Sequence, residues 1–136
     1  MSNDRLSRLV IAAAVAGGGL AVAVLPATTA GAATPPVTVT VKCSGTSTAN
    51  LQLQREDTGR LSVDFGVDMA RHKAGVQWKV TETDNGTTFV STTDKTIRDG
   101  SFSITRLLVP AAGANTVVGT ATNPVTGESC TVHGTV

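Results

Sequence analysis

Residues 60–69, which read RLSVDFGVDM, decide the fold class of this chain. Every second position of this stretch is apolar: Leu61, Val63, Phe65, Val67 and Met69. A β-strand turns successive side chains to opposite faces, so a period of two predicts a strand with one buried face. This stretch therefore predicts a β-strand that covers a hydrophobic core on one side.

Similar patterns recur before and after this stretch. They predict further strands over residues 37–43, 51–54, 76–83, 87–93, 101–105, 116–122 and 130–136. Asn85-Gly86 is a strong hairpin signal after the strand 76–83, because both residues tolerate positive φ. Residues 37–136 are therefore predicted to be one all-β domain, a single antiparallel immunoglobulin-like β-sandwich of about seven or eight strands.

Residues 1–32 read as a secretory signal peptide. The stretch begins with the basic side chains Arg5 and Arg8, continues through an apolar run, and ends with Ala30-Gly31-Ala32. Small side chains at both of these alanines fit the pocket of a signal peptidase. We predict cleavage between Ala32 and Ala33, followed by a short proline-containing leader over residues 33–36. An uncleaved anchor is the alternative, since the apolar run approaches the length needed to span a bilayer.

The chain contains only two cysteines, Cys43 and Cys130. Both fall on the inward faces of their predicted strands, the first and the last. Disulfides form and persist outside the cytoplasm, so an exported chain with two cysteines is expected to pair them. The bridge would close most of the domain into one loop, which the chain-entropy account equates with about 4 to 5 kcal/mol of stability. Two free thiols, or a bond between two chains, are the alternatives.

The charge balance argues against a nucleic-acid partner. The full chain has 11 basic and 10 acidic side chains, and loss of Arg5, Arg8 and Asp4 with the signal leaves nine of each. Nucleic-acid binding draws much of its affinity from basic side chains that neutralise phosphates. We therefore expect no nucleic-acid partner, and no membrane contact after signal cleavage.

No motif of an enzyme or a metal site stands out. His72 and His133 are the only histidines, and neither has a spacing typical of a metal site or a catalytic triad. Asp64 and Asp68 share the polar face of one strand, but lie roughly 13 Å apart at strand rise. Paired glycosidase carboxyls need about 5 to 9.5 Å. We expect no catalytic residue, no metal ligand and no cofactor.

Arg71, His72 and Lys73 form the candidate ligand site of this sequence. They stand together in a flexible connection between two predicted strands and could hold an anionic group, although such charged connections are commonly only solvated. Trp78 is the other residue of interest. Val76 and Val80 share its face, so we expect its ring in the core rather than in a ligand site.

Three stretches, GVQWKV at 75–80, DGSFSI at 99–104 and ATNPVTGESC at 121–130, resemble small secreted proteins of high-GC Gram-positive bacteria. The resemblance extends over most of the mature domain and implies export and a β-fold. That group has no assigned activity, so it implies no function.

Together these observations predict a secreted, non-enzymatic binding or surface-interaction module with an extracellular or cell-wall partner. An extracellular protease inhibitor is the alternative, with an exposed loop at residues 70–75 or 108–115. A small hydrolase that uses His72 or His133 is a third possibility, for which the sequence offers less.

Overall fold

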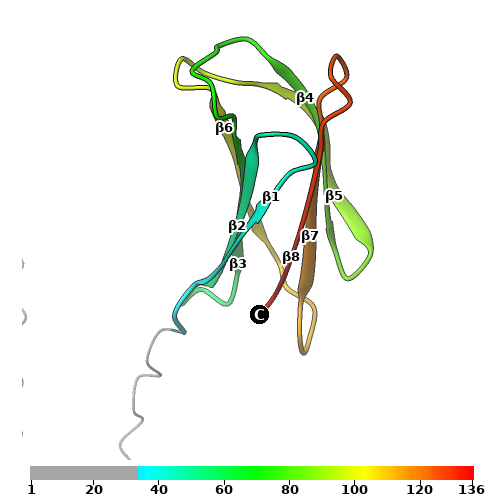
Figure 1. Ribbon diagram of the computed structural model, residues 1–136. Helices are drawn as coiled ribbons and strands as arrows, with labels where there is room; N and C mark the ends of the chain where they lie inside the picture. Colours follow the sequence, from blue (N-terminus) through cyan, green and yellow to red (C-terminus); the bar gives the residue numbers. More distant parts are fainter. Residues whose placement is uncertain (1–33) are drawn as a thin grey trace, which may run out of the picture. The chain divides into compact units, whose positions relative to one another are not determined.

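The computed structural model describes residues 34–136 (Figure 1). The predicted signal peptide, and its cleavage point between Ala32 and Ala33, lie outside the described residues. Residues 34–36 precede the first strand and belong to no helix or strand.

Eight strands form two four-stranded antiparallel sheets that face each other (Figure 1). The first sheet has the order β1 (Val37–Lys42), β2 (Thr48–Arg55), β3 (Leu61–Asp68), β6 (Ser101–Leu108). The second has the order β5 (Thr87–Lys95), β4 (Gln77–Asp84), β7 (Thr116–Thr122), β8 (Ser129–Thr135). The predicted all-β sandwich is confirmed, and the described part of the chain contains no helix. The strand order differs from that of an immunoglobulin domain. The first sheet here has the order β1-β2-β3-β6, whereas the corresponding immunoglobulin sheet has the order A-B-E-D, in which the fifth strand follows the second.

The core lies between the sheets, and it consists of the side chains that the alternation of the sequence assigns to the inward faces of the strands. On β3, Leu61, Val63, Phe65 and Val67 are all buried. Trp78 and Val80 of β4 meet this layer from the second sheet. The period of two in residues 60–69 therefore marks a half-buried strand, as predicted, although β3 itself ends at Asp68.

Cys43 and Cys130 form the predicted disulfide bond, with their Cα atoms 4.3 Å apart. Cys130 lies in β8, and Cys43 directly follows β1, so the strand predicted over residues 37–43 ends one residue earlier. β1 and β8 are edge strands of different sheets. The bridge therefore ties the two sheets together along one side of the sandwich, whereas β5 and β6 are the edges on the other side.

The connections gather at two ends, here called upper and lower as in Figure 1. The upper end holds the disulfide and the connections 43–47, 69–76, 96–100 and 123–128. The lower end holds the connections 56–60, 85–86 and 109–115 together with Val136. Each end is thus built from segments that are distant in sequence.

Two local features differ from the predictions. β2 begins at Thr48, within the predicted loop, because the small side chain of Ala49 fits the core and its backbone pairs on both sides. The pattern of residues 87–93 predicts Phe89 as the inward aromatic side chain, but Val90 is the fully buried residue of β5, and Phe89 packs against the core only in part. A bulge in β5 opposite Glu82 and Thr83 leaves Phe89 without a partner in the ladder, so its ring is only half-buried.

Candidate functional site

A hollow of about 440 Å³ lies at the upper end, between the connections 69–76 and 123–128. We call it the basic hollow. The side chains that line it are those of Met69, Arg71, Lys73, Val76, Gln77, Asn123, Val125 and Thr126. This hollow therefore includes two of the three residues that the sequence singled out as a ligand site.

Hydrogen bonds to Thr96 hold the first wall of the basic hollow. The buried hydroxyl of Thr96 donates to the carbonyl of Lys73 at 2.5 Å and accepts from the amide of Val76 at 3.0 Å. Gly100 supports the same loop from the other side. A Cβ atom at Gly100 would lie 2.1 Å from the carbonyl oxygen of Arg71, so the close approach requires glycine. The backbone that carries both cations is thus fixed to the sandwich.

A buried asparagine holds the second wall. The Oδ1 atom of Asn123 accepts hydrogen bonds from the amides of Val125 and Thr126, at 2.9 and 3.2 Å. This Asx-type turn holds Val125 at the tip of the β7–β8 connection, where its side chain is 88% exposed. An apolar side chain is therefore presented to solvent beside the hollow.

The charges of the basic hollow have one sign. Arg71 and Lys73 are its charged lining residues, and no carboxylate lines it. His72, which stands between them in sequence, is not among the lining residues. The pKa of Asp99 is lowered chiefly by hydrogen bonds from Ser101, and in small part by His72. The structure thus separates His72 from the two cations that flank it.

The other residues considered from the sequence lie apart from this hollow. Trp78 is fully buried, and its ring lies 6.4 Å from that of Phe102, as the core prediction requires. His133 is exposed on β8, and His72 is exposed in the connection 69–76. Across residues 34–136, no three of the side chains His, Cys, Asp and Glu come together as a metal site would require.

The sequence reasoning missed two acidic residues on the inner face of β4. Glu82 is 0% exposed, and neither of its carboxyl oxygens has a hydrogen-bond partner within the described structure. Burial raises the pKa of Glu82 to about 7, although the positive charge of Arg106 opposes this shift. The alternation of Trp78 and Val80 extends to Glu82, so the sequence did carry a signal for an inward carboxyl.

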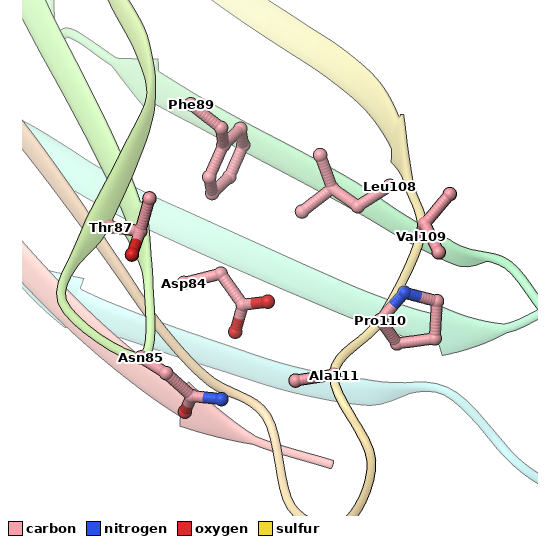
Figure 2. Close-up of a pocket in the computed structure, with 8 residues that line it drawn as sticks. All are labelled: Asp84, Asn85, Thr87, Phe89, Leu108, Val109, Pro110 and Ala111. Atoms are coloured by element: carbon pink, nitrogen blue, oxygen red, sulfur yellow. The ribbon is translucent and has the colours of Figure 1, made fainter.

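Asp84, two residues further along β4, lines a second hollow of about 340 Å³ at the lower end (Figure 2). We call it the acidic hollow. Its lining residues are Asp84, Asn85, Thr87, Phe89, Leu108, Val109, Pro110 and Ala111. One wall is therefore part of the loop 108–115 that the sequence suggested as an inhibitor loop.

Within residues 34–136, there is no helix long and apolar enough to cross a membrane. Comparison with known proteins gives no match: no family, no curated protein and no solved structure is significantly similar to the chain. The two hollows are therefore the features of the molecule that bear on its function.

Proposed function

We propose that this protein is a secreted, non-enzymatic binding module whose basic hollow takes up a ligand that joins an anionic group to an apolar body. One observation carries the proposal. Arg71 and Lys73 share a hollow with Met69, Val76 and Val125, and no carboxylate lines it. Cations without an opposing charge favour an anion, and apolar side chains beside them favour a ligand with an apolar part.

Size and rigidity support this reading. A volume of about 440 Å³ lies within the range of about 300 to 1,000 Å³ typical of small-molecule sites. Thr96 and Asn123 fix the backbone of the two walls. Binding to a preformed site loses less conformational entropy than binding to mobile loops.

Export is part of the proposal and rests on the signal sequence at residues 1–32. The Cys43–Cys130 bridge supports it, because disulfides persist mainly in oxidising compartments outside the cytoplasm. The ligand or partner would then be an extracellular or cell-wall molecule.

The test uses two fluorescent probes of similar shape. We expect 8-anilinonaphthalene-1-sulfonate to bind the folded mature chain more tightly than the uncharged N-phenyl-1-naphthylamine. The double variant Arg71→Gln/Lys73→Gln should weaken sulfonate binding by about tenfold or more and leave the uncharged probe little changed. Added salt should weaken only sulfonate binding, because the cations are exposed to screening.

The control is Lys42→Gln/Arg60→Gln, which removes the same charge from exposed positions outside the hollow. It should leave sulfonate binding unchanged. Equal loss in both double variants would show a general effect of net charge and contradict the proposal. Thermal denaturation of each variant separates lost binding from lost folding, since this sulfonate also binds partly unfolded chains.

A further inference from the structure

We propose that the acidic hollow is a second binding site, for a small organic ammonium ion with an apolar body. It lies at the opposite end of the sandwich from the basic hollow, and no residue lines both. The two proposals therefore stand on separate residues and can fail separately.

The carboxylate of Asp84 is the charged group of this site. In the view of Figure 2, it lies in the middle of the ring of lining residues. Its Oδ1 atom is buried and has no hydrogen-bond partner in the described structure. A buried acceptor without a partner is costly, and an ammonium N–H group at this point would satisfy it.

Apolar side chains surround this acceptor. Phe89 lies on one side of the hollow, and Leu108, Val109 and Pro110 lie on the other (Figure 2). Val109 is 79% exposed, although it is a large apolar side chain. The ring of Phe89 can also attract a cation through its π face. These side chains suit a hydrocarbon body attached to the ammonium group.

The bulge in β5 explains why an aromatic ring stands here. Val90 pairs opposite Glu82 and points into the core, so a regular strand would turn Phe89 to the outer face. The extra residue breaks this alternation and re-aims the ring toward the hollow. Bulges of this kind are over-represented next to functional sites.

Hydrogen bonds hold the connection 109–115, which forms the second wall of the hollow, in one conformation. The side-chain Nδ2 atom of Asn85 donates to the carbonyl of Ala114 at 3.3 Å, and the guanidinium of Arg55 donates to the carbonyl of Gly113 at 3.0 Å. Within the loop, the Oδ1 atom of Asn115 accepts from the amide of Ala111 at 3.1 Å. The loop is thus braced by β2, by the β4–β5 turn and by itself.

The nearby cations are already engaged elsewhere. Burial raises the pKa of Asp84, against the smaller, opposing effect of Arg55. Its guanidinium donates to two backbone carbonyls, those of Gly113 and Val136, and neither of these bonds involves Asp84. Arg106 is exposed, and its guanidinium donates to the carbonyl of Thr105 at 2.9 Å. The carboxylate of Asp84 therefore remains available to a ligand.

Glu82 gives independent support. It is fully buried on the same face of β4, roughly 7 Å from Asp84 along the strand. Both of its oxygens lack partners. Unsatisfied buried acceptors are rare in folded proteins and tend to mark functional regions. When ionised, Glu82 adds negative potential two residues from Asp84 on the same strand and so favours a cation there.

An ammonium ion fits better than a metal ion. The hollow is lined by one carboxylate and five apolar side chains, whereas calcium takes six to eight oxygen ligands and magnesium six. A volume of about 340 Å³ is near the lower end for ligand sites, which limits the ligand to a small molecule.

The experiment is a titration of the ¹⁵N-labelled mature chain, followed by NMR, with 2-phenylethylamine and with its uncharged analogue 2-phenylethanol. At pH 7 we expect the amine to shift the amide signals of residues 84–89 and 108–111, and the alcohol to bind at least about tenfold more weakly. Asp84→Asn should reduce amine binding to the level of the alcohol.

Two further variants complete the design. Asp57→Asn removes an exposed charge from the neighbouring turn at the same end and should leave amine binding unchanged. Ala111→Lys adds a cation at the exposed rim, keeps Asp84 intact, and should abolish amine binding even if Asp84→Asn does not fold. Equal binding of amine and alcohol, full binding by Ala111→Lys, or shifts confined to other residues would overturn the proposal.

Discussion

The ring of Phe65 on β3 reaches across the sandwich to the backbone of Gly119 on β7. A Cβ atom built on Gly119 would lie 2.5 Å from Cδ2 of this ring, closer than real atoms approach. Phe65 is fully buried, so its ring has little room to move aside. The absence of a side chain at Gly119 is therefore what lets the largest side chain of β3 fill the space between the sheets.

Gly119→Ala should lower the free energy of unfolding by about 1 to 3 kcal/mol, because the added methyl group overpacks the core against Phe65. Chemical denaturation measures the change. Gly134→Ala is the milder comparison and should cost less, since its Cβ atom would lie 3.0 Å from Leu53 and 3.1 Å from Leu51, contacts that shifts of a few tenths of an ångström can relieve. A loss in Gly134→Ala as large as that in Gly119→Ala would contradict this account.

Replacement of Cys43 and Cys130 by alanine should lower the free energy of unfolding by about 2 to 5 kcal/mol, because the unfolded chain regains the freedom that the bridge removes. A non-reducing peptide map should first show the two cysteine peptides linked in the purified protein. Free thiols in the freshly purified protein would contradict the structure.

Trp78 is the only tryptophan of the chain and is 0% exposed. Its fluorescence should be blue-shifted in the native protein and poorly quenched by iodide. Trp78→Ala should cost about 3 to 5 kcal/mol of stability, because it empties a large volume of the core. Strong quenching, together with an unchanged melting temperature in the variant, would show that the ring is not a core residue.

Stability should depend on pH through Glu82. Its pKa rises from 4.5 to about 7 on folding, chiefly through burial, against the attraction of Arg106 and with a small contribution from Asp64. The folded chain therefore binds more protons than the unfolded chain between these pH values. Its free energy of unfolding should fall by about 2 to 3 kcal/mol as the pH rises from about 4.5 to above 7.

Denaturation curves of wild type and Glu82→Gln over this pH range provide the measurement. The variant should lose this part of the pH dependence, because an amide does not titrate. Glu56→Gln, which removes a carboxylate from the β2–β3 turn, should keep it. A wild-type protein that becomes more stable as the pH rises above 5 would show that Glu82 is ionised in the fold.

The strands were predictable from local alternation, and the disulfide from the presence of only two cysteines, which the same alternation places on inward faces. Leu61, Phe65 and Cys130 each fall on the inner face that a period of two assigns to them. The ring of Phe89 was not predictable in this way, since one extra residue in β5 breaks the period. The inward position of Glu82 could have been predicted, because it continues the alternation of Trp78 and Val80.

The hollows could not be read from the sequence. Asp84 and Pro110 line one of them but belong to segments that only the stacking of the two sheets brings together. The basic hollow joins Lys73 to Val125 in the same way. The sequence identified Arg71 and Lys73 as charged loop residues, but the apolar side chains opposite them come from another connection.

The position of the disulfide also determines how the domain would respond to tension. β1 runs from the lower end to the upper end, where Cys43 meets Cys130, and β8 returns to the lower end. A force applied at residue 34 and at Val136 would therefore pass along β1, through the covalent bond and back along β8. Residues 44–129 lie outside this load path. An oxidised molecule that is pulled by its ends can thus lengthen only by peeling away its two outermost strands, and both hollows would keep most of their walls under load.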